Sequence, residues 1–537
     1  MVPSKRSCQP SAFSFEVKVF AFGAQLTDTV AAARHAAMIE LNFVIVILLF
    51  KKLLLQIIPN YKINHKKALI KPLHDTNDKK SPLYCYLYRN KTKGQKNMLK
   101  KISFGIAMIA GLCSCAASHD TLSQDEKALR EHITQGMPQT VREMHADDQD
   151  VIALPYTYSV PTIRGMFQEM YYWDTFYTNE GLLMLGNADQ ARSNVDNILY
   201  MIEHFGYMPN GTHKGLLNRS QPPYSSMMVR SVYETTGDKQ WLAQAYTTLE
   251  KEHTFWMTQR LAPNGLNRYG HCATDEELVG FYGAISGRLR TDRSETVKTL
   301  ADTLKASAHW LAEAESGWDF NPRYSQRCMD FNPVDLNALL YVFERNMAWF
   351  SKELGNGRTA EWDSLADNRK SLIQKYCFNP EDGLFHDYDF VNECWSKVLS
   401  GGVFNLMYAG IMTKKQAAAM VKALPRLEME HGVAACEDIP SELTYQWAFP
   451  NAWAAINYMA IRGMDRYGFR SDARRLARKY LDSNVGQFKE TGVLWEKYNA
   501  TTGRNDAASE YGTPGDFMGW TAGVVLFTMD YLCGKSE

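Results

Sequence analysis

The sequence predicts an all-helical domain that begins near residue 120 and continues to the end of the 537-residue chain. Three observations support this fold class. Apolar residues recur with a helical period through most of this region, convincing alternating strands are few, and no linker-like segment interrupts it. A helical domain of roughly 400 residues exceeds a simple helix bundle. We therefore expect a toroid in which antiparallel helix pairs surround a central core.

The clearest helix is expected within residues 187–206, NADQARSNVDNILYMIEHFG. Its apolar residues follow the spacing i, i+4, i+7 and i+11 from Ala191, which puts them on one face of a helix. Asn187 is a suitable N-cap, and Gly206 is a suitable residue just beyond the C-terminus. The end signals therefore agree with the period.

The same pattern predicts further helices along the chain. They are expected at 294–317, beginning at Ser294, at 335–357, running from Asp335 to Gly355, and at 413–424 and 471–481. The best candidate for a strand is GLFHDYDF, residues 383–390. The polar and aromatic stretches lie between the helices, where loops on a rigid scaffold commonly carry function.

Residues 1–97 do not resemble the rest of the chain. The stretch 51–80 is rich in Lys, Asn and Ile without a steady period, and the apolar run FVIVILLF has only eight residues, too few to span a bilayer. We interpret 1–97 as an extension from a start codon assigned too early, for which no fold is expected. The alternatives are a single-pass membrane anchor or a genuine N-terminal domain.

A secretory signal is predicted from Met98, in MLKKISFGIAMIAGLCSC. Two lysines, an apolar segment and then small residues follow the layout of a bacterial signal peptide, here residues 98–115. LCSC resembles a lipobox, which would make Cys115 the lipidated first residue of the mature protein. Cys113 inside that box is unusual, so lipidation stays open. The mature domain is expected over 116–537, exported to the periplasm or anchored to the envelope.

Composition excludes several classes of function. Lys plus Arg and Asp plus Glu both number 59, so nothing indicates a nucleic-acid partner. The six cysteines after residue 115 are scattered, without a CxxC pair or a His at ligand spacing, so no metal site is predicted. No phosphate loop, glycine-rich cofactor turn or nucleophile elbow is present, so no cofactor is expected.

The segments between helices share an unusual composition of Trp, Tyr, carboxylates, Arg and amides. Such a set offers flat apolar faces and many hydrogen-bonding groups, which suits the C–H faces and hydroxyl rim of a sugar ring. The predicted partner is therefore a small carbohydrate. The segments are FQEMYYWD (167–174), PNG (209–211), RSQPP (219–223), GRLRTD (287–292), ESGWDF (315–320), YQWAFPNAW (445–453), LWEKYN (494–499) and SEYG (509–512).

Two carboxylates in these segments are candidates for acid–base chemistry. Glycoside cleavage generally needs two carboxyl groups on opposite sides of one bond, one of them protonated. Asp319 and Glu496 each directly follow a Trp, whose contact would raise a carboxyl pKa by desolvation. The alternative is that each forms a structural ion pair, for which Arg323 and Lys497 are close enough in sequence.

The ordered motifs resemble the trehalase family of glycoside hydrolases. FQEMYYWD resembles part of that family's first signature, RFxExYxWD, and YQWAFPNAW resembles its second, QWDxPNGW. PNG, RSQPP, ESGWDF, DLNALL, DYD, EKYN and EYG with GWTAG follow in the family's order. The resemblance extends from about residue 150 to 530. It rests on the ordered series more than on any one motif.

The resemblance implies an (α/α)6 toroid and an inverting mechanism, most simply hydrolysis of α,α-trehalose to two glucose molecules. It assigns the general acid to Asp319 and the general base to Glu496. The implied substrate-binding residues are Trp173, Asp174, Asn210, Arg219, Ser220, Gln221, Arg290, Asp292, Gly317, Trp447 and Glu510. Asp174 is expected against sugar hydroxyls and Arg side chains, with Trp173 as a wall. The enzyme is expected to be a monomer.

Several positions depart from the family pattern. The Arg of the first signature falls on Met166, with Arg164 the only Arg nearby, and the Asp of the second falls on Ala448. Losing a charged sugar contact can cost orders of magnitude when its partners are left unpaired. Two alternatives therefore stay open: a hydrolase of the same fold acting on another α-linked glucoside, and a non-catalytic glycan-binding lipoprotein. Both Asp319 and Glu496 are retained, which speaks against the second.

Overall fold

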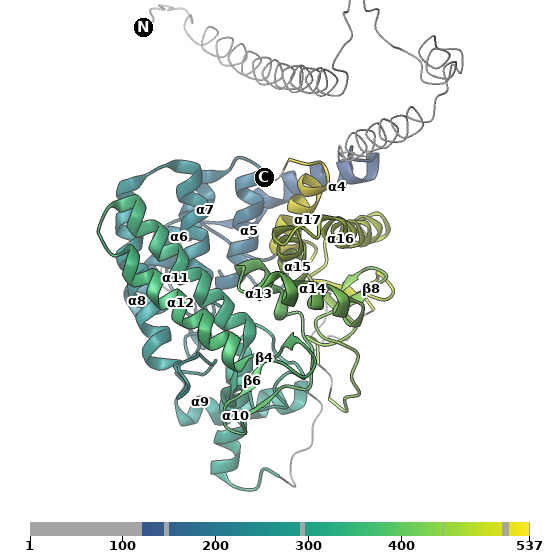
Figure 1. Cartoon of the computed structure of the whole chain (residues 1–537). Helices are drawn as coiled ribbons and strands as arrows, with labels where there is room; N and C mark the ends of the chain where they lie inside the picture. The colour runs from purple at the N-terminus through teal and green to yellow at the C-terminus, as the bar shows by residue number, and fades with distance from the viewer. Residues whose placement is uncertain (1–120, 144–149, 290–295, 444, 507–514, 536–537) are drawn as a thin grey trace, which may run out of the picture. The chain divides into compact units, whose positions relative to one another are not determined.

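The computed structural model describes residues 121–143, 150–289, 296–443, 445–506 and 515–535 (Figure 1). These residues belong to one compact unit, Ala116–Glu537. The predictions for 1–97, for the signal peptide and for Cys115 lie outside the described residues. Within the described ranges, no helix combines the length and the apolar character that a membrane crossing requires.

Six helices form a closed inner ring around the centre of this unit (Figure 1). Each packs against the next, and the last, α17, packs on the first, α5. The inner helices are largely buried all round; α17, for example, exposes little beyond its final residues. The inner helices are α5 (Tyr172–Met184), α7 (Ser225–Thr236), α11 (Val334–Leu354), α13 (Val403–Ala409), α15 (Ala454–Arg466) and α17 (Gly519–Leu532).

Six outer helices alternate with the inner ones along the chain, which confirms the predicted (α/α)6 toroid. Because each outer helix runs back beside the ring, all inner helices point the same way, and their N-terminal ends meet at one mouth. The outer helices are α4 (Gln124–Gly136), α6 (Ala188–Phe205), α8 (Lys239–Gln259), α12 (Thr359–Tyr376), α14 (Lys414–Ala423) and α16 (Arg470–Thr491). A further pair, α9 (Asp275–Arg288) and α10 (Leu300–Glu315), is inserted between α8 and α11.

Local capping explains most of the helix boundaries. Asn187 caps α6 by accepting from the main chain of Gln190, and Gly206 ends it in the left-handed conformation at φ 79°. The helix expected from Ser294 begins instead at Leu300, after a reciprocal capping box between Thr299 and Asp302. The apolar period read before residue 299 was therefore misleading, and the Leu300 side chain is 64% exposed.

The strands are short and join loops near the ring. They are β1 (Val141–Arg142), β2 (Tyr158–Ser159), β3 (Phe331–Asn332), β4 (Phe378–Asn379), β5 (Leu384–Phe385), β6 (Tyr388–Asp389), β7 (Cys394–Trp395), β8 (Glu428–Met429), β9 (Gly432–Val433), β10 (Asn451–Trp453) and β11 (Lys497–Asn499). All pairs are antiparallel: β1 with β2, β4 with β5, β8 with β9, β10 with β11, and β3–β6–β7 as a three-stranded sheet. Short 3-10 segments occupy Met137–Thr140, Lys214–Leu216, Cys328–Asp330 and Leu424–Arg426.

The predicted strand at 383–390 is in fact two strands that belong to different sheets. Leu384–Phe385 pairs with β4, whereas Tyr388–Asp389 pairs with β3 and β7. The pair that matters most for the site is β10 with β11, because Trp453 lies opposite Lys497. This register fixes the segment that carries Glu496 beside the tryptophans of the second signature.

Candidate active site

A cavity of about 270 Å³ opens at the N-terminal ends of the inner helices. The sequence brings its walls together from loops and first helical turns far apart in the chain. Trp173 and Asp174 lie in the first turn of α5, and Trp520 in the first turn of α17. The lining residues are Pro161, Met166, Phe167, Tyr171, Trp173, Asp174, Asn210, Leu216, Arg219, Gln221, Arg288, Ala314, Gly317, Asp319, Trp447, Trp453, Glu496 and Trp520.

Stacked tryptophans form one wall of the cavity. The rings of Trp447 and Trp453 are parallel within 3° and their centroids are 3.8 Å apart. Trp447 also contacts Trp173 at 5.4 Å and stacks on Trp318 at 5.2 Å. Indole faces of this kind pack well against the C–H face of a sugar.

The position of the Trp173 ring leaves room only for glycine at residue 317. The glycine has φ +73°, a conformation that other residues rarely adopt. A Cβ atom at this position would lie 2.8 Å from Cζ2 of Trp173, closer than van der Waals contact allows. The turn therefore lets the chain pass directly beside the ring and leads into Asp319.

Asp319 lies in the cavity under opposing electrostatic influences. Its Oδ2 is 3.6 Å from Nη2 of Arg288, and its side chain is 30% exposed. Burial raises the pKa of the Asp319 carboxyl, the positive charges of Arg288 and Arg219 act to lower it, and Glu496 acts to raise it. The raised pKa is the condition a general acid needs.

Glu496 forms an ion pair with Lys497. The Nζ of Lys497 donates to its Oε2 at 2.7 Å, and both side chains are buried. The ammonium also lies 4.9 Å from the centroid of the Trp453 ring. The ion pair anticipated as a structural alternative thus exists for Glu496, yet the carboxylate still lines the cavity.

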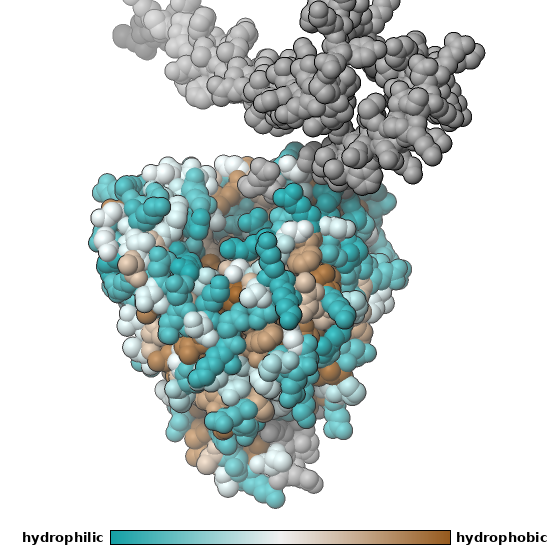
Figure 2. Space-filling view, in the orientation of Figure 1, coloured by the Kyte–Doolittle hydropathy of each residue, from teal (hydrophilic) through white to brown (hydrophobic). Residues whose placement is uncertain are grey.

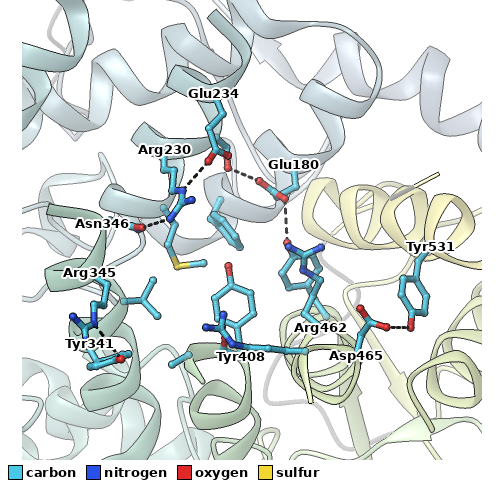
Figure 3. Close-up of a pocket in the computed structure, with 17 residues that line it drawn as sticks. Glu180, Arg230, Glu234, Tyr341, Arg345, Asn346, Tyr408, Arg462, Asp465 and Tyr531 are labelled. Carbon is cyan, nitrogen blue, oxygen red and sulfur yellow. Dashed lines mark hydrogen bonds and ion pairs between the residues drawn. The ribbon is translucent and has the colours of Figure 1, made fainter. Parts of the chain in front are cut away.

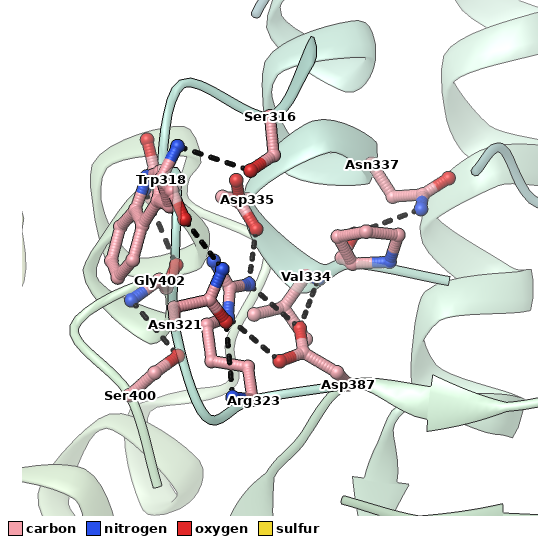
Figure 4. A network of polar contacts seen from close by, with 12 residues as sticks. Ser316, Trp318, Asn321, Arg323, Val334, Asp335, Asn337, Asp387, Ser400 and Gly402 are labelled. Carbon is pink, nitrogen blue, oxygen red and sulfur yellow. Dashed lines mark hydrogen bonds and ion pairs between the residues drawn. The ribbon is translucent and has the colours of Figure 1, made fainter. Parts of the chain in front are cut away.

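Arg323, by contrast, does not pair with Asp319. It is fully buried behind Trp318, with its Cζ 4.5 Å from the ring centroid (Figure 4). Its guanidinium donates to both oxygens of Asp387, at 2.8 and 2.9 Å, and to Asp335. The network supports the Trp318 ring from behind and so fixes the turn that carries Asp319.

Asp174 is a third acid in the same cavity. Burial raises the pKa of its carboxyl to about 7, and the negative charges of Glu496 and Asp319 add to that effect. Among the described residues no arginine forms an ion pair with Asp174, although Arg219 and Arg288 line the same cavity. Its neighbours are the two candidate catalytic carboxylates instead.

Most of the other expected binding residues line the cavity, namely Asn210, Arg219, Gln221 and Trp447. Ser220 lies behind it: its hydroxyl donates to the main-chain oxygen of Met208, and its N–H donates to Glu315. Glu315 is itself held by two hydrogen bonds of 2.8 Å from Arg260.

Some expected site residues cannot be located, and others were missed. Arg290, Asp292 and Glu510 lie outside the described residues. Arg288 was missed, although it belongs to the same GRLRTD segment. Trp453 and Trp520 were also missed, although both fall in quoted motifs.

The two departures from the family signatures lie in different surroundings. Met166 lines the cavity and is 44% exposed. Ala448 does not line it and packs against the cluster that contains Phe320 and Tyr445. Arg164 is 82% exposed and 3.9 Å from Asp516, so it does not substitute for the missing Arg of the first signature.

Two acids, Asp319 and Glu496, in one aromatic cavity at one mouth of an (α/α)6 toroid form the arrangement of a glycoside hydrolase. No group of His, Cys, Asp and Glu that could hold a metal ion occurs within the part of the chain that the structure describes. A sequence model of the Trehalase family matches residues 111–533. The chain belongs to the trehalase family.

Similar proteins agree with this assignment. A periplasmic trehalase of Xanthomonas axonopodis pv. citri is 31% identical over 439 residues, 78% of this chain and 75% of the relative. A periplasmic trehalase of Escherichia coli O1:K1 is 29% identical over 440 residues, 76% and 75% of the two chains. The structure of neutral trehalase Nth1 from Saccharomyces cerevisiae has a TM-score of 0.61 at 26% identity, covering 76% of this chain and 80% of that one.

Proposed function

We propose that this protein hydrolyses α,α-trehalose to two glucose molecules with inversion at the attacked carbon. The observation that carries the proposal is that Asp319 and Glu496 line one cavity in different electrostatic surroundings. Burial raises the pKa of Asp319, which favours its protonated form. The Lys497 ammonium donates to Oε2 of Glu496 at 2.7 Å. One acid is thus suited to donate a proton and the other to accept one.

In this mechanism Asp319 protonates the glycosidic oxygen while its bond to the anomeric carbon breaks. A water oxygen forms the new bond to that carbon, and Glu496 takes the proton that the water releases. One water is consumed, and solvent exchange returns the two acids to their starting states. An intervening water requires the two carboxyl groups to be roughly 6.5–9.5 Å apart, against about 5–5.5 Å for a retaining pair.

Two observations support trehalose as the substrate. The relatives at 29–31% identity are described as trehalases. The cavity of about 270 Å³ is near the lower limit of small-molecule sites, roughly 300 Å³, which suits a disaccharide better than a long glycan. Another α-linked glucoside is the second candidate, and Met166 favours it because an apolar side chain lines the cavity where the family signature has Arg.

The decisive test combines two conservative variants with matched controls. Asp319→Asn removes the proton and Glu496→Gln removes the base, so each should lower the rate on trehalose by about 10²–10⁴-fold while sugar binding survives. Asp482→Asn, at a side chain 60% exposed, and Glu490→Gln, on the exposed face of α16, should leave the rate unchanged. Full activity in either catalytic variant would refute its assigned role.

Proton NMR of the product gives an independent test of the stereochemistry. Hydrolysis of the α-linked substrate with inversion releases β-glucose from the attacked ring, which then mutarotates. The leaving glucose keeps its α configuration, so the first products should be α- and β-glucose in equal amounts. Initial formation of α-anomer alone would show a retaining mechanism. A panel of α-linked disaccharides assayed in parallel decides between trehalose and the second candidate.

We further propose that the enzyme is exported and acts as a monomer. The similarity to periplasmic trehalases supports export, as does the signal-like sequence that begins at Met98. Native protein should then begin at or near Cys115, and intact mass would report any lipid attached there. Peptides from residues 1–97 in the native protein would contradict the proposed start site.

A further inference from the structure

A second, larger cavity of about 620 Å³ lies among the inner helices and shares no lining residue with the first. All six inner helices contribute to it, and most of its residues come from their C-terminal halves (Figure 3). On α5, Glu180 lines this cavity and Asp174 lines the other, six residues earlier and about 9 Å along the helix. The second cavity therefore lies at the opposite mouth of the ring.

Aromatic side chains separate the two cavities. Phe176 lines the second cavity and stacks on Tyr224, with centroids 4.8 Å apart. Tyr224 in turn contacts Trp173 of the first cavity at 6.5 Å. On the face seen in Figure 2, hydrophilic side chains predominate over the ring helices and hydrophobic ones show between them.

The carboxylates of the second cavity already accept hydrogen bonds from the protein. Glu180 accepts from the hydroxyls of Ser231 and Tyr458, each at 3.0 Å. Glu234 accepts from Nε of Arg230 at 2.9 Å. The third, Asp465, likewise accepts from a tyrosine hydroxyl at 2.9 Å. Glu180 thus uses both of its oxygens within the protein, whereas Glu234 and Asp465 each use one.

Three hydrogen-bond donors of this cavity, in contrast, have N–H or O–H groups that the described part of the protein does not use. Among the described residues, the Arg462 guanidinium makes no hydrogen bond or ion pair, although it lies near Glu180 and Asp465. The hydroxyl of Tyr408 points into the cavity and has no hydrogen-bond partner within the described ranges (Figure 3). Arg466 uses one nitrogen for the main-chain oxygen of Tyr408, at 3.1 Å. These three residues can all donate, and two of them, Arg462 and Arg466, are cationic.

We propose that this cavity binds a small polar molecule that carries an oxyanion, a carboxylate or a phosphate, with Arg462 and Tyr408 as its direct ligands. An oxyanion supplies the acceptors that these donors lack, and charge-assisted hydrogen bonds to guanidinium are strong. The volume of about 620 Å³ lies within the usual range of small-molecule sites. Because the site is separate from the catalytic cavity, its failure would leave the proposed hydrolysis untouched.

Calorimetric titration of the whole protein tests this site with four probes: inorganic phosphate, glucose 6-phosphate, glucuronate and neutral glucose. At least one anionic probe should bind more tightly than glucose. Arg462→Gln and Tyr408→Phe should each weaken that binding by about ten- to a hundredfold, the usual worth of a charge-assisted hydrogen bond. Arg462→Lys, which keeps the charge, should be intermediate. A preference for the phosphates or for glucuronate identifies the group that is recognised.

Two controls keep the test specific. Arg475→Gln changes an arginine on α16 that is 43% exposed and lies outside the cavity, and it should bind the probe as the unaltered protein does. Asp174→Asn changes the catalytic cavity and should also leave the affinity unchanged. The proposal is overturned if no anionic probe binds more tightly than glucose. It is also overturned if Asp174→Asn abolishes the binding of the anionic probe, or if Arg462→Gln binds that probe with unchanged affinity. Thermal melting of each variant confirms that it is folded.

Discussion

The carboxylate of Asp319 lies 3.6 Å from the guanidinium of Arg288, measured between Oδ2 and Nη2. Arg288 is the last residue of α9, one of the two helices inserted between α8 and α11. The candidate general acid therefore depends on a cation from outside the ring. Burial raises the pKa of Asp319, and this cation is the larger of the two arginine effects that oppose the rise.

Replacing Arg288 should move the pH profile of hydrolysis. In Arg288→Gln the opposing positive charge is gone, so the pKa of Asp319 rises further. A general acid acts while protonated, so the alkaline limb of the kcat profile should shift to higher pH. Steady-state rates across pH 5–10 measure the shift, with Arg475→Gln as the control. An alkaline limb that stays in place, or moves to lower pH, would contradict the role of Asp319 as the acid.

The sequence predicted the helical toroid well because periodicity reports the buried face of a helix directly. Residues 187–206 show this, since both the apolar spacing and the two end residues agree with α6. The start at Ser294 failed because apolar spacing also occurs by chance outside helices. There the local capping box at Thr299 decided the boundary.

The candidate site was predicted where motifs mark loops and missed where contacts depend on tertiary packing. The motifs predicted that Trp173, Asp319 and Glu496 belong to one site, and all three line one cavity. No sequence spacing shows that Arg288 approaches Asp319. A motif also does not give the direction of a side chain.

Asp174 should make the protein less stable as the pH rises from about 4 to 7. Its folded pKa is about 7, whereas an unfolded aspartate has a value near 4. Between these values the folded state keeps a proton that the unfolded state releases, so the free energy of unfolding falls with increasing pH. Asp174→Asn lacks this loss and should be more stable than the unaltered protein above pH 7.

The expected gain is on the order of 2 kcal/mol, after allowance for water that reaches the cavity. Urea unfolding at several pH values between 4 and 8 measures it. The difference between the two proteins should become small near pH 4, where the folded state is protonated at Asp174 and the unfolded state is about half protonated. Asp482→Asn, at an exposed site, is the control. A variant that is equally or less stable at pH 8 would show that Asp174 is ionised and stabilised in the folded protein.

Arg323 should be essential for stability because it is the shared cation of two buried acids. The side chains of Arg323, Asp335 and Asp387 are between 0 and 3% exposed. Arg323→Met leaves both carboxylates without a countercharge, which should lower the free energy of unfolding by about 3–5 kcal/mol. Urea denaturation measures the loss. Arg475→Gln removes a guanidinium that is 43% exposed and leaves Glu428 paired with Lys479, so it should cost about 1 kcal/mol or less.

The triple change Arg323→Met, Asp335→Asn and Asp387→Asn separates charge from packing. If unpaired charge causes the loss, removing the two carboxylates should recover part of it. If the triple variant is no more stable than Arg323→Met, the arginine acts through its packing on Trp318, 4.5 Å away. In that case the turn that carries Asp319 should loosen, and kcat should fall in both variants alike.

The two departures from the family signatures should respond differently when reversed. Met166 lines the catalytic cavity, so Met166→Arg can add a charged donor to a bound sugar. One such hydrogen bond is worth about 1.5–3 kcal/mol, which corresponds to a gain of roughly ten- to a hundredfold in kcat/KM for trehalose.

Ala448 packs instead against the cluster of Phe320 and Tyr445. Ala448→Asp should therefore give no such gain and should lower the melting temperature, because a carboxylate beside apolar side chains loses hydration. Steady-state kinetics on trehalose and on a panel of other α-linked disaccharides measures both variants. Met166→Leu, which keeps an apolar side chain of similar size, is the control for volume. A gain for Ala448→Asp with none for Met166→Arg would mean that the bound sugar reaches residue 448 and that the cavity described above is incomplete on that side.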